Sequence, residues 1–130
     1  MNISQQIQEF ENAYSIEEYH ERLDDKRNLI LIAEFEGKPA GFKIGYEVED
    51  SFYSWMGGVV PEFRRKKIAA GLADSQEEWC SKIGYKIIRL KTRNKHNKML
   101  LFALSRKYQI VGFEEKDDAM ESRILLEKIL

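Results

Sequence analysis

Four consecutive basic residues, Arg64 to Lys67, separate a strand pattern that ends at Val60-Pro61 from a long amphipathic helix pattern that ends at Ile83. The N–H groups in the first turn of a helix have no partner within the helix, and together with the helix dipole they favour an anion. Cations in that turn oppose the dipole unless an anion binds there. The segment therefore predicts a site for a phosphorylated ligand. The alternative is that the basic side chains only cover the edge of a sheet.

The charge of the chain is strongly segregated although the net charge is only −1. Residues 1–62 carry a net −8, residues 63–108 carry +10, and residues 109–130 carry −3. A basic middle between acidic flanks favours a local anion site, although such faces can also serve solvation alone. The chain as a whole is slightly acidic and has no recognised nucleic-acid motif, so nucleic acid is not an expected partner.

The composition is that of one folded domain covering residues 1–130, with 43% hydrophobic residues and 2 prolines. The start of the chain does not resemble a signal peptide, and the uncharged runs are much shorter than a membrane span. Cys80 is the only cysteine, and no Cys or His spacing matches a zinc site, so no metal is expected. We expect a cytoplasmic protein without a membrane partner.

The hydrophobic periodicity predicts the element order ααβββαβαββ. Helices are expected at 3–13, 15–26, 65–83 and 98–107, and strands at 29–35, 40–48, 52–60, 86–92, 108–115 and 122–129, with turns at 37–39 and 49–51. The first strand is interpreted as buried on both faces at its start. The strands on either side of the long helix should be parallel, because a helix of that length forms a crossover connection. A long final strand also suggests a homodimer that pairs through it.

The segment from Val59 to Ala69 resembles the GNAT acetyltransferase superfamily. Members carry a strand that ends in V-x-P-E-Y/F, then R-x-x-G-x-G/A, then a helix. Arg64 matches the first position of the second motif and Ala69 the last, while Lys67 replaces the middle glycine. The element order also agrees over residues 28–130. The resemblance implies an α/β (α+β) fold with a mixed, mostly antiparallel twisted sheet and helices on both faces.

The resemblance further implies that acetyl-coenzyme A, as co-substrate, lies across the basic loop. The thioester carbonyl would accept a hydrogen bond from a strand N–H near Val59 and Val60. A helical backbone at Lys67 would make the replacement of glycine cost little. The residues assigned to the cofactor are Val59, Val60, Arg64, Arg65, Lys66, Lys67, Ile68, Ala69 and Ala70, with Asn94 and Asn97 as alternatives for the family's asparagine.

The acid and base of the family do not stand at their usual places. The family's tyrosine acid corresponds to Ala103, four residues before Lys107-Tyr108, which replace a Gly-Phe pair. Tyr108 is therefore a candidate acid. The position of the family's base is occupied by Tyr53, which can orient a water, and Glu34 and Glu47 are alternatives.

Two classes of function remain open. The first is an N-acetyltransferase that acts on a primary amine of a small molecule or a protein, and the acidic residues 1–62 favour a cationic acceptor. The second is a non-catalytic module that binds coenzyme A as a sensor or partner domain. Lys67 and the absence of the family's tyrosine favour the second class.

Overall fold

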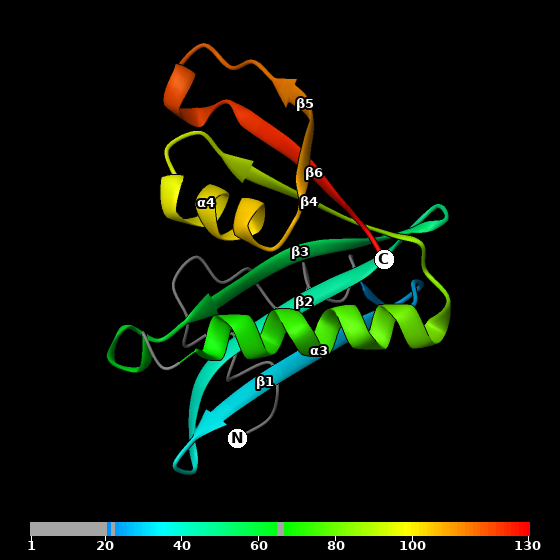
Figure 1. Ribbon diagram of the computed structural model, residues 1–130, viewed down its shortest axis with the longest axis vertical. Helices are drawn as coiled ribbons and strands as arrows, with labels where there is room; N and C mark the ends of the chain where they lie inside the picture. The colour runs from blue at the N-terminus through cyan, green and yellow to red at the C-terminus, as the bar shows by residue number, and fades with distance from the viewer. Residues whose placement is uncertain (1–20, 22, 65–66) are drawn as a thin grey trace.

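The computed structural model describes residue 21, residues 23–64 and residues 67–130 (Figure 1). The helices predicted at 3–13 and over most of 15–26 lie outside the described residues, as do Arg65 and Lys66.

Six strands form one sheet in the order β1-β2-β3-β4-β6-β5 (Figure 1). Among the strands that the structure describes, only the β3–β4 pair is parallel, and the helix α3 connects these two strands. The predicted mixed, mostly antiparallel sheet with one crossover is therefore confirmed. The strands are β1 Asn28–Phe35, β2 Lys38–Val48, β3 Ser51–Val59, β4 Ile87–Arg93, β5 Gln109–Glu114 and β6 Arg123–Ile129.

The position of β6 corrects one prediction. The final strand lies between β4 and β5, so it has no free edge through which two copies could pair. The edge strands of the sheet are β1 and β5. β1 also differs from its prediction, because from Asn28 to Ala33 its residues are only half-buried rather than fully buried.

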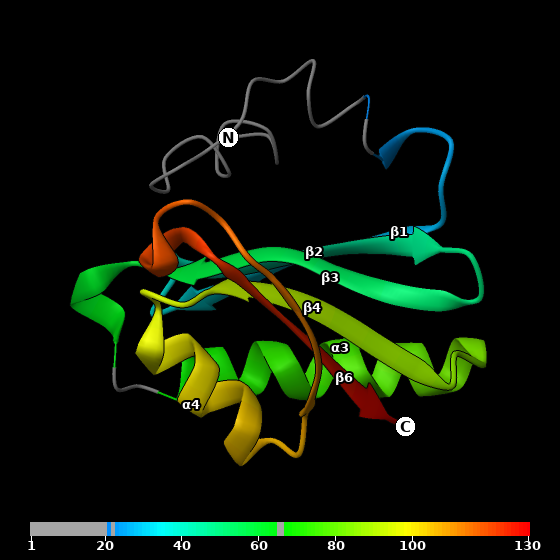
Figure 2. The same cartoon turned by 90° about the horizontal axis from the view of Figure 1, so that it is seen from above.

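The two described helices are α3, Ile68–Ile83, and α4, Asn97–Ser105, and both lie on the same side of the sheet (Figure 2). Leu23 packs on the opposite face with Phe42 and Ile44 of β2. Gly84 ends α3 with a φ of 110°, as its sequence position predicted. In the described part of the chain, no helix combines the length and the hydrophobicity that a membrane crossing requires.

Backbone conformation explains the remaining differences from the predicted elements. The β1–β2 turn consists of Glu36 and Gly37, with φ of 52° and 80°, because two left-handed residues match the twist of a two-residue hairpin. Pro39 accordingly belongs to β2 instead of the turn. Two short 3₁₀ helices, Pro61–Phe63 and Ala119–Glu121, lack the length that periodicity needs and were not predicted.

The main core joins α3 and α4 to the sheet. Its fully buried members include Phe52 of β3, Ile88 of β4 and Leu126 of β6. Phe52 makes ring contacts with Trp79 and Tyr85 at centroid distances of 5.4 Å and 5.6 Å. This cluster fixes the start of β3 against the start of β4.

Candidate functional site

β3 and β4 are paired at one end and separate at the other (Figure 1). Their only ladder pairs are Phe52↔Ile88 and Tyr53↔Arg89. Beyond Tyr53, β3 continues to Val59 without β4 beside it, while β4 stays paired with β6. Among the described residues, no strand pairs with the edge of β3 that faces β4 after Tyr53, so the end of this edge, toward Val59, is open to a ligand.

A β-bulge at Trp55 accompanies this separation. Gly45 pairs with Ser54 and Ile44 pairs with Met56, so Trp55 is the additional residue of β3. Bulges bend and twist the strand that carries them. Here the bulge lies two residues after Tyr53, the last residue of β3 that pairs with β4, so it bends β3 close to the point where the two strands separate.

Strand alternation shows which N–H groups point to the open edge. The N–H of Val60 donates to the carbonyl of Ala40 at 2.8 Å, so it points to β2. Alternate residues of a strand direct their N–H groups to opposite sides, which turns those of Gly57 and Val59 away from β2. The expectation that the N–H of Val60 could bind a thioester carbonyl is therefore wrong. The N–H of Val59 points to the open edge, as that role requires, and the N–H of Gly57 points there as well.

The start of α3 differs from its prediction in a way that bears on anion binding. The helix begins at Ile68 instead of residue 65, and Lys67 is its N-cap with a φ of 61° and a ψ of 21°. That backbone is left-handed, so the expectation of a helical Lys67 is wrong. This left-handed residue stands immediately before Ile68, the first residue of α3.

The first turn of α3 carries no acidic residue, and the side chain of its N-cap residue, Lys67, makes no capping hydrogen bond among the described residues. Lys67 contributes its carbonyl to the N–H of Gly71 at 3.0 Å, the first bond of the helical series. The N–H groups of residues 68–70 precede that bond and point out of the helix end. They form the positive end of a 16-residue helix dipole.

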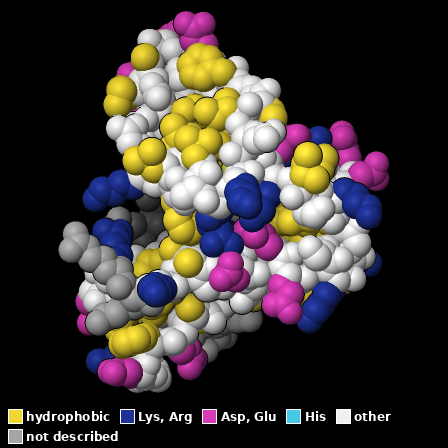
Figure 3. Space-filling model, in the orientation of Figure 1, with side chains coloured by type: hydrophobic (Ala, Val, Ile, Leu, Met, Phe, Trp, Pro, Cys, Tyr) yellow, Lys and Arg dark blue, Asp and Glu magenta, His cyan; other side chains and the backbone are white. Residues whose placement is uncertain are grey.

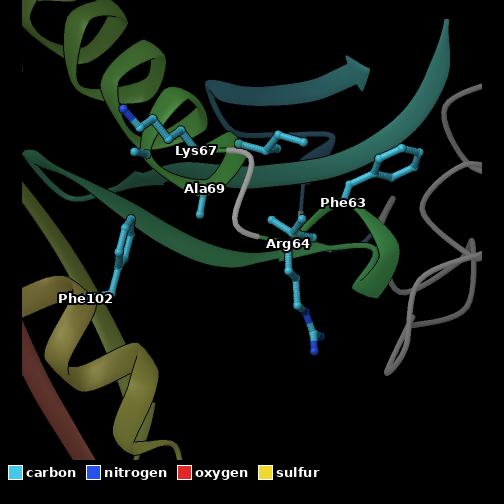
Figure 4. Close-up of a pocket in the computed structure, with 8 residues that line it drawn as sticks. Phe63, Arg64, Lys67, Ala69 and Phe102 are labelled. Atoms are coloured by element: carbon cyan, nitrogen blue, oxygen red, sulfur yellow. The ribbon is translucent and has the colours of Figure 1, made fainter. Parts of the chain in front are cut away.

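A pocket of about 300 Å³ lies at this helix end (Figure 4). In Figure 4 the ring of Phe102, from α4, faces Ala69 across the pocket, and the side chains of Arg64 and Lys67 extend in different directions. The lining residues are Val59, Phe63, Arg64, Lys67, Ile68, Ala69, Ala70 and Phe102.

Most of the predicted cofactor residues that the structure describes therefore meet at one pocket. The end of β3, the basic loop and the first turn of α3 all contribute to it. Neither asparagine lines it: the Asn94 side chain donates to the carbonyl of Ala119 at 3.3 Å, and Asn97 is an exposed residue at the start of α4. Their role as cofactor ligands stays a prediction.

The catalytic candidates are not gathered at this pocket. Glu34 is exposed on the edge strand β1, two strands away from β3. Tyr53 lies on β3 with its ring 5.5 Å from that of Tyr46, on the face opposite α3. Glu47 accepts a hydrogen bond from Tyr85. Their roles stay predictions.

Tyr108 lies in the main core and is only 6% exposed. Burial raises the pKa of its hydroxyl, and the charges of Glu77 and Cys80 act in the same direction. The hydroxyl therefore stays protonated, as an acid requires, but the ring does not line the described pocket. Ala103, at the place of the family's tyrosine, is 1% exposed.

An ion-pair cluster lies between α3 and the β4–β6 half of the molecule, where basic and acidic side chains meet in Figure 3. Glu77 of α3 accepts from Lys128 at 2.6 Å and from Arg106 at 3.1 Å, and all three side chains are less than one-fifth exposed. Arg106 also pairs with Asp74 at 2.5 Å. These bonds connect α3 to β6 and to the end of α4.

A comparison with protein families matches residues 3–106 to the acetyltransferase (GNAT) family. The chain belongs to that family. The resemblance seen in the sequence is confirmed, and with it the class of enzyme, an acetyltransferase. No curated protein sequence matches the chain.

Comparison with solved structures supports the same fold for this chain. The ribosomal-protein-S18-alanine N-acetyltransferase from Escherichia coli has a TM-score of 0.79 at 19% identity, over 98% of this chain and 83% of that one. Ard1 from Thermoplasma volcanium has a TM-score of 0.80 at 15% identity, over 99% and 94%. A GNAT family acetyltransferase from Elizabethkingia anophelis, solved with acetyl-CoA bound, has a TM-score of 0.75 at 16% identity, over 89% and 84%.

Sequence reasoning missed three residues that the geometry brings to the site. Phe102 lies on an apolar helix pattern that predicts core packing, so nothing marked it as a pocket residue. Gly57 carried a usable signal, because a glycine inside a strand often marks a bulge or a close backbone approach. Phe63 follows a strand end and was noticed only as part of the motif.

Proposed function

We propose that the chain transfers the acetyl group of acetyl-coenzyme A to a primary amine. One observation carries the proposal: the open edge of β3 leads to the uncapped start of α3, and both border the same pocket. The pyrophosphate would bind the first-turn N–H groups of α3 with Arg64 beside it. The thioester would lie along β3, within reach of the N–H groups of Gly57 and Val59.

This arrangement supports the chemistry of acyl transfer. A neutral amine that attacks the thioester carbonyl forms a tetrahedral oxyanion. N–H groups of an open strand edge are fixed by the sheet, so they can stabilise that oxyanion without reorganisation. Holding the amine beside the thioester supplies a further part of the rate by proximity. A strong acid or base is not required for such a mechanism to operate.

The acceptor would carry a primary amine on a small molecule or a protein. The net charge of −8 over residues 1–62 supports a cationic acceptor, such as a lysine, a polyamine or a protein N-terminus. The similar enzyme from Escherichia coli is named for an alanine of a ribosomal protein, which supports the protein N-terminus as one form of acceptor.

One observation favours a second candidate, a non-catalytic coenzyme A sensor. Ala103 stands where the family has its tyrosine acid, and Tyr108 does not line the described pocket. A domain of this kind would bind acetyl-coenzyme A and leave the thioester intact.

Binding and turnover separate the two candidates. A ligand at about 100 times its dissociation constant stabilises the folded state by about 2.7 kcal/mol, a thermal shift of several degrees for a domain of this size. Thiol release from acetyl-coenzyme A, measured with a panel of amines, identifies the transferase. A thermal shift without thiol release identifies the sensor, and no thermal shift at millimolar ligand contradicts both.

Arg64→Ala tests the pocket directly. Loss of a charge-assisted bond to phosphate should weaken coenzyme A binding by about tenfold or more, with little change in stability. Lys82→Ala is the matched control, because it removes a cation from the other end of α3, where the side chain is 74% exposed. Equal binding by the two variants would contradict the proposed site of the pyrophosphate.

A further inference from the structure

Lys43 of β2 points toward the same side of the sheet as α3. A Cβ at Gly41, two residues earlier on the strand, would lie 3.1 Å from Ile68 and 3.3 Å from Leu72, so that strand face looks at α3. Residues two apart share a face of a strand, which places the Lys43 side chain there too. Its position in the sequence, inside an apolar strand pattern, did not indicate that Lys43 lies near the candidate site.

The Lys43 side chain lies next to the open edge of β3. Lys43 pairs with Gly57, and its Cγ lies 3.5 Å from the position that a Cβ of Gly57 would occupy. Gly57 has no side chain to block the space over β3. Because the N–H of Gly57 points to the open edge, the lysine lies beside one of the two donors proposed for the thioester carbonyl.

The charges around Lys43 do not neutralise it. Glu77 attracts the ammonium, but both of its oxygens already accept from Lys128 and Arg106. Burial, and to a smaller extent the charge of Arg106, lower the pKa of Lys43 to about 8, although the charge of Glu77 acts in the opposite direction. The Lys43 side chain is therefore a neutral amine in about one-tenth of the molecules at pH 7 and in about half of them at pH 8.

We propose that Lys43 is itself an acetyl acceptor, modified by the acetyl-coenzyme A that binds along the open edge of β3. The proposal rests on the proposed function for the presence of the thioester. It adds a modification site and a second kind of acceptor, a side chain of the same chain.

The reaction is an ordinary aminolysis of a thioester. The neutral ε-nitrogen of Lys43 attacks the thioester carbonyl carbon, and a C–N bond forms as the C–S bond breaks. The thiolate leaves and takes the proton that the nitrogen loses, so the products are Nε-acetyl-lysine and coenzyme A. The N–H groups of Gly57 and Val59 would stabilise the oxyanion of this step as well.

The rate should follow the neutral fraction of Lys43. It should rise steeply between pH 6.5 and about 8 and level off above that, whereas an ordinary lysine continues to gain neutral amine up to about pH 10.4. The titratable groups on the elements packed around this space include Asp74, Glu77 and Cys80 of α3, Arg106 and Tyr108 after α4, and Lys128 of β6.

The experiment incubates the full chain with millimolar acetyl-coenzyme A and no added amine, followed by intact-mass measurement and peptide mapping. We expect one acetyl group per chain, located at Lys43, with a rate that levels off near pH 8. Excess coenzyme A should slow this labelling at least tenfold. A small acetyl thioester without the nucleotide should label exposed lysines and leave Lys43 unmodified.

Two variants sharpen the test. Lys43→Arg keeps a cation and removes the nucleophile, so the label should disappear, whereas Lys38→Arg changes an exposed lysine of the same strand and should leave it in place. A thermal shift with acetyl-coenzyme A but no acetyl group at Lys43 would overturn this inference and leave the proposed function standing. Labelling of Lys43 that coenzyme A does not slow would also overturn it. Absence of any thermal shift would remove the proposed function and this inference together.

Discussion

The two ends of β3 differ in the burial of their side chains and in their pairing with β4. At its start, Phe52 is fully buried against Trp79 and Tyr85 and pairs with Ile88 of β4. At its end, Gly57 and Gly58 carry no side chains, and no strand of the described residues pairs with the edge that faces β4. The difference shows how the sheet can leave backbone donors free at one end, because an apolar cluster at the other end holds the strands together.

The largest effect is expected from breaking the paired end. Phe52→Ala removes a fully buried ring and should lower the free energy of unfolding by about 3–5 kcal/mol in urea denaturation. Gly58→Ala is the control at the open end, where a Cβ would make an ordinary 3.4 Å contact with the Phe42 ring, and it should change stability by less than about 1 kcal/mol. Similar losses in the two variants would contradict the contrast between the ends.

A pH-dependent effect is expected from Lys43, whose pKa is lowered to about 8 by burial. Because the unfolded lysine keeps its proton up to about pH 10.4, the folded state is penalised below pH 8 and regains stability as the pH rises from 8 to 10.4. Lys43→Met should therefore stabilise the protein by up to about 3 kcal/mol at pH 7 and by much less at pH 10.

Urea denaturation at the two pH values measures this difference. Lys38→Met, a change at an exposed position of the same strand, is the control and should leave stability nearly unchanged at both pH values. A gain from Lys43→Met that is equal at pH 7 and pH 10 would show that the packing of the methionine side chain, not the removal of the charge, governs stability at this site.

A smaller effect, on binding alone, is expected at the pocket wall. Phe102→Ala should weaken acetyl-coenzyme A binding by about three- to tenfold, because the ring lines the pocket and would bury apolar surface against a ligand bound there. Leu101→Ala changes the neighbouring residue of α4, which is 65% exposed and does not line the pocket, and should leave binding unchanged in calorimetry. Unchanged binding in both variants would exclude this wall from the ligand site.

The smallest expected effect concerns two lysines with left-handed backbones, Lys67 with φ 61° and Lys107 with φ 73°. Glycine has no penalty in that region, so Lys67→Gly and Lys107→Gly should each raise the free energy of unfolding by about 1 kcal/mol. Only Lys67→Gly should also change coenzyme A binding, since only Lys67 lines the described pocket. A loss of stability in Lys67→Gly would contradict the left-handed N-cap.

These two lysines show what the sequence could and could not predict. Both stand where the GNAT pattern has glycine, so the resemblance located positions with special backbone requirements. The residue types themselves gave the opposite indication, because lysine fits a helix well and the pattern extended the helix back to residue 65. A left-handed φ arises from the direction in which the chain must leave the loop, and local periodicity does not record that direction.

The strands were predictable for a different reason. In β2, β3 and β6, apolar residues either alternate with polar ones or form continuous runs, over lengths that a two-residue period detects. The crossover through α3 then fixes one parallel pair of strands. The separation of β3 from β4 was not predictable, because it depends on which residues find partners across the sheet. Phe102 and Lys43 were missed for the same reason, since each reaches the site from an element distant in sequence.

The most direct test of the open edge is a backbone amide NMR titration with acetyl-coenzyme A. The account predicts large shift changes for the N–H groups of Gly57 and Val59 and for those of residues 68–70, while Phe52 and Tyr53 at the paired end stay nearly unchanged. Binding that leaves Gly57 and Val59 unchanged, with shifts confined to other parts of the chain, would contradict the central claim that this strand edge holds the thioester.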